Sequence, residues 1–199
     1  MTANGERGKV TVVCAQYGLP GLCRQYGGAE REELPRCSHT DKLKTLGELV
    51  QIVARAKAEN QRVVFANGCF DLLHGGHISY LEDAAAQGDV LIVAVNGDGS
   101  TRALKGEGRP CYPQEHRVEI LAAMEMVDYI VVFEEPTVSH LLESLRPHVH
   151  AKGTDYTRET VPERDTARAL GIETYIAGEP KEDASRRIIG RIRGEGTGA

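Results

Sequence analysis

The sequence contains no run of 18 or more apolar residues, and its first residues lack the apolar core of a signal peptide. We therefore expect no transmembrane helix, and the default expectation is a cytoplasmic protein without a membrane partner. A basic excess is also missing, because 24 Lys and Arg stand against 29 Asp and Glu, for a net charge of −5. This balance argues against a dedicated nucleic-acid binder, whose phosphate contacts need positive charge.

Paired cysteine motifs are absent as well. The five cysteines include no CxxC pair, which predicts free thiols in a reducing cytosol rather than a disulfide framework. Cys14, Cys23, Cys37 and His39 are the one set to consider as zinc ligands, and their spacings fit no standard zinc pattern. The GxGxxG sequence of dinucleotide-binding folds does not occur either.

What is present is an ordinary globular composition, with 41% hydrophobic and 27% charged residues in a chain of 199. That length predicts one compact domain and a shorter segment of chain outside it. Residues 1–44 show no sustained hydrophobic period and are rich in glycine, which predicts a loosely ordered N-terminal extension. Ordered structure is expected to begin at Thr45, which forms a capping box with Glu48, so the domain is expected to span residues 45–199.

Strand and helix patterns alternate along that domain. The apolar runs predict strands at residues 62–66, 89–96, 128–133, 148–151 and 173–177. Helical spacing and end signals predict helices at residues 45–60, 77–87, 113–126, 137–146, 162–170 and 183–193. This alternation predicts an α/β fold, a Rossmann-like doubly wound parallel five-stranded sheet with helices on both faces. Ligands of such sheets bind beyond the C-terminal ends of the strands.

The sharpest feature is residues 67–77, NGCFDLLHGGH, which link a predicted strand to a predicted helix. Two histidines, His74 and His77, flank two glycines. Glycine lets the backbone approach a phosphate closely, and a helix start offers free N–H groups to an anion. Imidazoles at that point can donate hydrogen bonds to phosphate oxygens during transfer. The segment therefore predicts a phosphate-binding loop, with a zinc site or a purely structural loop as the alternatives.

The segment GCFDLLHGGH resembles the GxFDxxHxGH signature of the cytidylyltransferase-like nucleotidyltransferases. Further resemblances follow in order: residues 104–110 to an LKGxxRP loop, 115–117 to an ExR element, 127–133 to a VDxVVxF strand and 152–156 to a KGxDY loop. Together they cover about residues 45–193. Within the family, the motifs most resemble those of the branch that transfers AMP from ATP to heptose 1-phosphate, here without a kinase domain.

The resemblance implies a role for each matching residue. His74, His77, Lys105 and Arg117 would be catalytic, binding the triphosphate and stabilising the transition state. Nucleotide binding is implied for Asn67, Gly68, Cys69, Phe70, Gly76, Asn96, Asp98, Arg109, Lys152, Ser185 and Arg186. Substrate binding is implied for Asp71, Asp155 and Tyr156. Helix capping is the alternative for Asp71 and Asp98, and ion pairing is the alternative for Arg117, a cation in the first turn of a predicted helix.

The implied partners are ATP and a sugar phosphate, with Mg²⁺ entering together with ATP and no metal held directly by the protein. Relatives commonly assemble as dimers or larger, so a homo-oligomer is implied. The sequence departs from the family before the last helix, where relatives carry a Ser-Thr-Thr type motif. Here only Ser185 keeps a hydroxyl, and Arg186 replaces another.

That departure leaves other functions open. One is a CTP-dependent transferase acting on glycerol 3-phosphate or a similar alcohol phosphate. Another is a nucleotide-binding regulatory protein with weak catalysis, and a third is a nicotinamide or pantetheine adenylyltransferase, which shares the HxGH motif. The favoured prediction is a nucleotidyltransferase that joins AMP to a sugar 1-phosphate and releases pyrophosphate.

Overall fold

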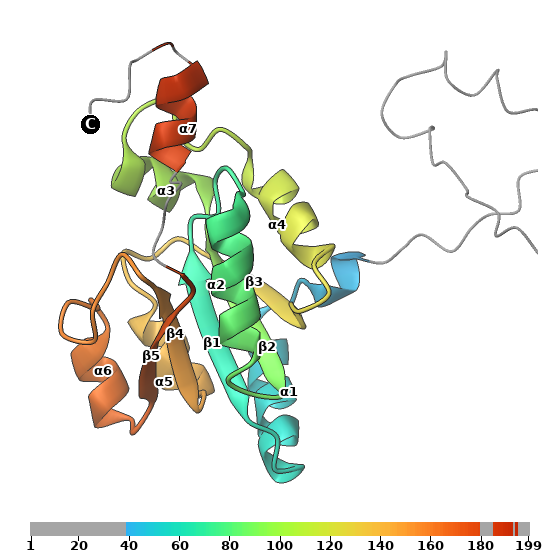
Figure 1. Ribbon diagram of the computed structural model, residues 1–199. Helices are drawn as coiled ribbons and strands as arrows, with labels where there is room; N and C mark the ends of the chain where they lie inside the picture. Colours follow the sequence, from blue (N-terminus) through green and yellow to red (C-terminus); the bar gives the residue numbers. More distant parts are fainter. Residues whose placement is uncertain (1–38, 180–184, 193, 195–199) are drawn as a thin grey trace, which may run out of the picture. The chain divides into compact units, whose positions relative to one another are not determined.

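The computed structural model describes residues 39–179, 185–192 and 194. Predictions about residues 1–38, including the extension and three of the candidate zinc ligands, lie outside the described residues. Five strands form one sheet: β1 (Val63–Gly68), β2 (Val90–Asn96), β3 (Tyr129–Phe133), β4 (Val149–Gly153) and β5 (Glu173–Ala177). All neighbours are parallel, in the order β3-β2-β1-β4-β5, which confirms the predicted sheet (Figure 1).

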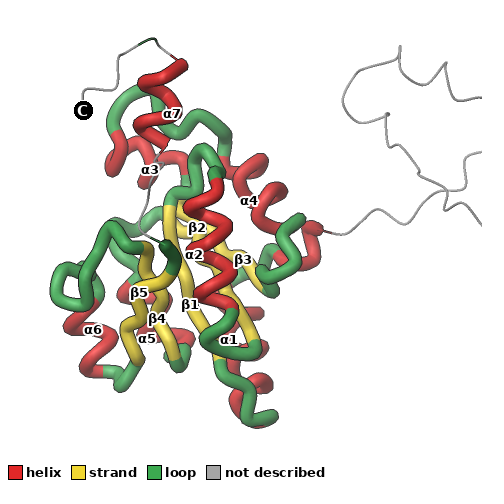
Figure 2. The backbone as a smooth tube through the Cα atoms, in the orientation of Figure 1, coloured by secondary structure: helices red, strands yellow, loops and turns green. Residues whose placement is uncertain are grey.

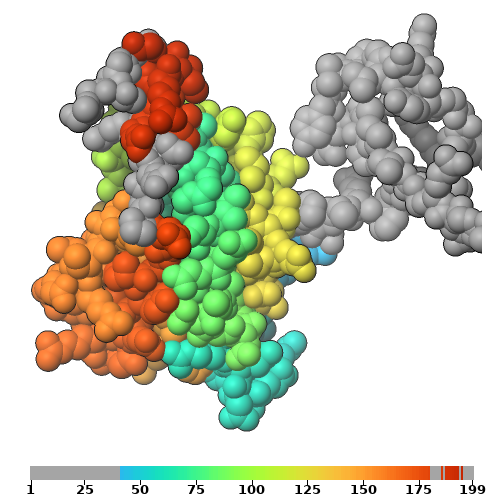
Figure 3. Space-filling model, in the orientation of Figure 1, coloured from blue at the N-terminus to red at the C-terminus, as the bar shows by residue number. Residues whose placement is uncertain are grey.

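Helices cover both faces of the sheet, as predicted (Figure 2). The described helices are η2 (a 3₁₀ helix, His39–Lys42), α1 (Leu46–Ala58), α2 (Gly75–Ala85), α3 (Asp98–Lys105), α4 (Gln114–Ala122), α5 (Ser139–Leu145), α6 (Arg164–Ala169) and α7 (Ser185–Ile192). None of them is long and apolar enough to cross a membrane. In the space-filling view, α2 lies on the near face between the yellow α4 region and the orange C-terminal part (Figure 3).

The central strand β1 is buried on both sides because its side chains alternate between two hydrophobic cores. Val64 and Ala66 pack in the core beneath α2 and α4, whereas Val63 and Phe65 pack in the core beneath α1, α5 and α6. Successive strand residues point to opposite faces of a sheet. A strand covered on both faces therefore has an unbroken apolar sequence, the pattern that predicted these strands.

Helix α3 is a difference from the prediction, which assigned no helix between residues 96 and 113. In its sequence, DGSTRALK, the buried residues are the polar Ser100 and Thr101, and the one large apolar residue, Leu104, is exposed, so no apolar stripe marks a helix. The first turn is stabilised from outside the segment, because the backbone N–H of Ser100 donates to the Glu134 carboxylate at 2.9 Å. A carboxylate at a helix N-terminus satisfies an orphan donor and complements the helix dipole. The helix therefore depends on a residue far along the chain.

The segment before α1 packs on the domain. Leu43 forms a parallel β-bridge with Ile130, and the Lys44 N–H donates to the Ile130 carbonyl at 2.8 Å. The Lys42 ammonium donates to the carbonyl of Met124 at 2.8 Å. Helix α1 then begins with the predicted capping box, in which Thr45 and Glu48 satisfy each other's backbone N–H groups. Leu43 and Lys44 thus lie beside the outer edge of β3, and η2 packs against α4.

Two glycines with positive φ permit a matched test of packing at the end of β5. Gly178 (φ +88°) would place a Cβ 3.0 Å from Tyr80 Cα, whereas Gly171 (φ +68°) would place one in open space. We expect Gly171→Ala to cost about 1–2 kcal/mol of unfolding free energy from backbone strain alone. Gly178→Ala should cost about 1–3 kcal/mol more, because α2 must also move away. Urea denaturation measures both, and equal losses would contradict the close approach.

Candidate active site

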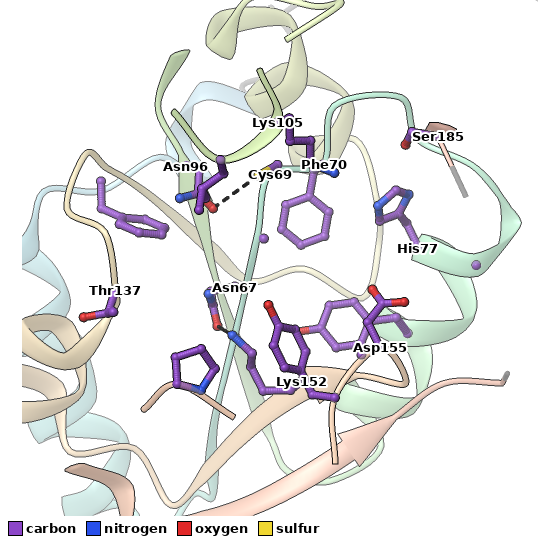
Figure 4. A pocket seen from close by; sticks show the side chains of 18 of the residues that line it. Asn67, Cys69, Phe70, His77, Asn96, Lys105, Thr137, Lys152, Asp155 and Ser185 are labelled. Atoms are coloured by element: carbon purple, nitrogen blue, oxygen red, sulfur yellow. Dashed lines mark hydrogen bonds between the residues drawn. The ribbon is translucent and has the colours of Figure 1, made fainter. Parts of the chain in front are cut away.

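A cavity of about 660 Å³ opens at the C-terminal ends of the strands. Asn67 of β1 and Lys152 of β4 both line it. The strand order reverses between β1 and β4, and that reversal is where doubly wound sheets bind their ligands. Figure 4 shows His77 and Ser185 on one side of the cavity and Asn67 and Lys152 on the other.

Most of the residues singled out from the sequence meet at this cavity. The structure brings together Asn67, Gly68, Cys69, Phe70, His74, Gly76, His77, Asn96, Lys105, Arg109, Lys152, Asp155, Tyr156 and Ser185. Asp71, Asp98 and Arg117 are not among the residues that line it, and the side chain of Arg186 lies outside the described part of the structure. Most of the predicted site residues therefore lie close together in the fold, although they come from distant parts of the sequence.

The two motif histidines stand together at the start of α2. His74 is the N-cap residue, and its Nδ1 accepts a hydrogen bond from the Gly76 N–H at 3.2 Å. A neutral His74 therefore carries its proton on Nε2. The ring of His77 lies 4.1 Å from the ring of His74 and 5.5 Å from that of Phe70, centroid to centroid.

This geometry corrects the predicted start of the helix. The helix begins at Gly75, two residues before the expected position at His77. The first-turn N–H of Gly76 is therefore engaged by His74 rather than left open to an anion. The chemistry at this end of the cavity consequently depends on the imidazole side chains more than on free backbone donors.

Asp71 holds a loop rather than facing the cavity. Its side chain is fully buried, and it accepts hydrogen bonds from the Arg109 guanidinium and from the backbone N–H groups of Cys111 and Tyr112. Both carboxylate oxygens are thus engaged within the protein. This differs from the predicted substrate-binding role. Asp71 positions residues 109–112, and with them the Arg109 side chain that lines the cavity.

Arg117 also differs from its predicted catalytic role. Its side chain is fully buried, and it donates to the carbonyls of Cys69, Asn96 and Tyr112 at 2.5, 2.7 and 3.1 Å. It pairs with Asp98 at 2.7 Å, and ion pairing was the alternative role for this arginine. Because all these donors are directed into the protein, Arg117 is a positioning residue that ties the ends of β1 and β2 to α4.

Two residues that were not predicted from the sequence lie at the cavity or directly beneath it. His150 is fully buried on β4, and its Nε2 lies 3.1 Å from the Asn67 side-chain oxygen. Glu163 lines the cavity and pairs with Lys152 at 3.3 Å. The available signal for His150 was its position two residues before Lys152, since a buried strand that repeats polar residues at i and i+2 presents both on one face. No local pattern marked Glu163.

Burial shifts the pKa values of the residues at the bottom of the cavity. It lowers the pKa of His150 to about 3, with the nearby Lys152 charge adding to the effect. Burial also lowers the pKa of Lys152, which its Glu163 partner opposes by favouring the ammonium. The Lys152 ammonium lies 4.7 Å from the centre of the Tyr156 ring, and burial raises the pKa of that tyrosine. The bottom of the cavity thus combines the neutral imidazole of His150 with the ammonium of Lys152, which is paired with Glu163.

The side chains that line the cavity suit an anionic substrate. Histidine and lysine side chains line it, and these groups recognise phosphate oxygens. Among the described residues, no group of three or more His, Cys, Asp or Glu is arranged to hold a metal ion. The chemistry that fits is stabilisation of developing charge on a phosphate chain.

Solved structures with similar folds support this assignment of the architecture. A lipopolysaccharide core biosynthesis protein from Thermoplasma volcanium is 27% identical, with a TM-score of 0.52, over 62% of this chain and 99% of that one. A pantoate-beta-alanine ligase from Francisella tularensis, 18% identical with a TM-score of 0.51, covers 72% of this chain and 68% of that one. The second likeness concerns the fold alone.

Curated relatives are more similar in sequence. The bifunctional protein HldE of Geobacter sulfurreducens is 51% identical over 76% of this chain and 31% of its own length. The protein of the same name from Pelobacter propionicus is 40% identical over 77% of this chain and 33% of its own length. The chain thus spans about a third of the length of these relatives. The family model described as cytidylyltransferase-like matches residues 65–180, and the chain belongs to that family.

Proposed function

We propose that the protein transfers AMP from ATP to a sugar 1-phosphate, with heptose 1-phosphate as the expected acceptor, and releases pyrophosphate. The observation that carries this proposal is the pair of imidazoles at the start of α2, in a cavity that also contains Lys105 and Lys152. The motif resemblance to the heptose branch supports the acceptor. So does the name of the structural relative from Thermoplasma volcanium, which refers to lipopolysaccharide core biosynthesis.

The reaction is an in-line displacement. An oxygen of the acceptor's phosphate attacks the α-phosphorus of ATP, the bond from that phosphorus to the bridging oxygen breaks, and the electron pair leaves with pyrophosphate. The attacking phosphate is already anionic near neutral pH, so the step needs no strong general base. The protein's task is to align the reactants and to neutralise charge on the triphosphate.

Four of the residues that line the cavity carry out that task. His74, with its proton on Nε2, and His77 donate to triphosphate oxygens as charge develops. Lys105 and Arg109 neutralise the leaving pyrophosphate. Mg²⁺ belongs to the substrate as MgATP and withdraws charge from the phosphates. A cytoplasmic location and a homo-oligomer stay predictions.

A second candidate is a cytidylyltransferase that uses CTP and an alcohol phosphate such as glycerol 3-phosphate. The description of the matching family favours it. The same cavity residues would perform the same displacement, since the reacting groups are again a triphosphate and an anionic phosphate. Only the contacts to the base and to the acceptor would differ.

A pyrophosphate-release screen separates the two candidates. ATP and CTP are each combined with heptose 1-phosphate, other sugar 1-phosphates and glycerol 3-phosphate. We expect release with ATP and heptose 1-phosphate at least about tenfold faster than with any other pair, a preference of about 1.4 kcal/mol. Fastest release with CTP and glycerol 3-phosphate would replace the proposal by the second candidate. ATP binding without release on any acceptor would contradict both.

A further inference from the structure

Four polar side chains form a connected, mostly buried unit across the reversal point of the sheet. The Asn67 oxygen lies 3.1 Å from His150 Nε2 and 3.3 Å from Lys152 Nζ, and Lys152 in turn donates to Glu163 at 3.3 Å. His150, Lys152 and Glu163 are each at most 5% exposed. We call these four residues the β1–β4 polar unit. Only Asn67 within it is half-buried, and it borders the cavity.

The contacts of the β1–β4 polar unit settle which way the Asn67 amide faces. An ammonium has donors and no acceptor, so the atom of Asn67 that faces Lys152 must be the oxygen. The carboxylate of Glu163 favours the charged form of Lys152, and this supports the assignment of the Asn67 oxygen as the atom that faces the ammonium. The amide nitrogen is then directed away from Lys152, as Figure 4 shows. Within the described part of the chain, no hydrogen bond from that nitrogen to another residue is present.

The same contacts settle the tautomer of His150. Its Nε2 faces an oxygen that can only accept, so Nε2 must carry the proton. Burial lowers the pKa of this imidazole to about 3, and the ring is therefore neutral at any pH where the domain is expected to work. A neutral ring with its proton on Nε2 has none on Nδ1, and Nδ1 is buried without a hydrogen-bond partner among the described residues.

We propose that His150 is a positioning residue of the site, which together with Lys152 fixes the Asn67 side chain so that its NH₂ group faces the cavity as a donor to a substrate oxygen. A free asparagine amide can flip and present either its oxygen or its nitrogen. Two donors on one oxygen exclude the flipped state. The anionic oxygens of a phosphate, or the hydroxyl oxygens of a sugar, are the acceptors that such a fixed NH₂ recognises.

This inference deepens the proposed function and rests on it for the identity of the substrates. The oxygen bound by Asn67 belongs either to ATP or to the acceptor sugar phosphate. The two sources share the same chemistry and are separated by steady-state kinetics. A variant that loosens Asn67 raises KM for the substrate whose oxygen it binds and leaves KM for the other substrate unchanged.

The kinetic test compares three variants of the full chain. His150→Leu removes the donor to Asn67, His150→Gln keeps an N–H near the position of Nε2, and His140→Leu makes the same change at an exposed histidine outside the unit. We expect His150→Leu to lower kcat/KM about tenfold, mainly through KM for one substrate, since a lost hydrogen bond has about that effect. His150→Gln should recover most of the loss, and His140→Leu should match the wild type.

Rescue by glutamine distinguishes positioning from a structural role, because a purely structural contribution of the imidazole ring would not return with a different side chain. Thermal melting of each variant accompanies the kinetics. Unchanged kinetics in His150→Leu would overturn the proposal. So would a loss that His150→Gln does not recover while both variants melt with the wild type.

A spectroscopic test stays informative even if the wild type turns over no sugar phosphate, an outcome that would count against the proposed function. Long-range ¹H–¹⁵N correlation spectra of the histidine side chains report the tautomer of each ring. We expect the His150 signal to show the proton on Nε2 between pH 5 and 8, and the Asn67 side-chain NH₂ signals to shift on adding ATP or a sugar 1-phosphate. A proton on Nδ1, or NH₂ signals that neither compound moves, would overturn the inference.

Discussion

Replacing His77 with alanine is expected to lower the turnover number at least about a hundredfold while the domain stays folded. The imidazole stands in the first turn of α2, 4.1 Å from the His74 ring, and borders the cavity. A donor directed at developing charge contributes about 10²–10³ in turnover in comparable sites. The change removes a side chain that packs against Phe70 without emptying the core. Pyrophosphate release at saturating substrates measures the effect.

His116→Ala is the matched control, because His116 is exposed on α4 and does not border the cavity. It should retain wild-type turnover. The assignment of His77 to the reaction fails if His77→Ala turns over within about threefold of the wild type. A melting curve that coincides with that of the wild type excludes unfolding as the cause of a loss.

The second large effect is expected from Arg117→Met, which should lower the free energy of unfolding by about 3–5 kcal/mol. The guanidinium is fully buried and donates to three backbone carbonyls as well as to Asp98. Methionine fills much of the volume but removes the Arg117 donor from the carbonyls of Cys69 and Tyr112, while the Asn96 carbonyl keeps the Thr101 hydroxyl at 3.3 Å. Each buried group left unsatisfied costs about 1–3 kcal/mol. Urea denaturation monitored by circular dichroism gives the change.

Arg102→Met makes the same substitution on the exposed part of α3 and should change stability by no more than about 0.5 kcal/mol. Arg117→Lys keeps the charge but cannot reach several carbonyls at once, so it should recover only a small part of the loss. If Arg117→Met costs less than about 1 kcal/mol, the carbonyls find other donors and the positioning role is contradicted.

The sheet could be predicted because the sequence of each buried strand is itself enough to identify it. A strand covered on both faces is apolar throughout, as in VLIVAVN of β2, and its buried pattern in the structure is nearly continuous. The expected strand at residues 173–177 coincides with β5. Helix α3 could not be found in the same way, because its N-terminal turn is held by Glu134 from another part of the chain. A local pattern cannot report a long-range cap.

The site residues, too, could be predicted only where their signal is local in the sequence. Residues 67–77 are contiguous in the sequence, so the histidine loop could be located from its residue pattern alone. His150 reaches Asn67 only because β1 and β4 pair with Phe65 opposite His150, and nothing local fixes that register. Arg117 shows the limit of a motif, since the resemblance of residues 115–117 to an ExR element implied a catalytic role, whereas its hydrogen bonds go to carbonyls within the protein.

The strand β3 lies at an edge of the sheet, and Leu43 and Lys44 run beside it at Ile130. An uncovered edge offers unpaired backbone groups to a second molecule and invites aggregation. A chain shortened to begin at Thr45 would keep every residue of the cavity yet lose this cover. Poor solubility of such a chain would then reflect an exposed strand edge rather than a defect of the site, and any shortening is better placed before His39.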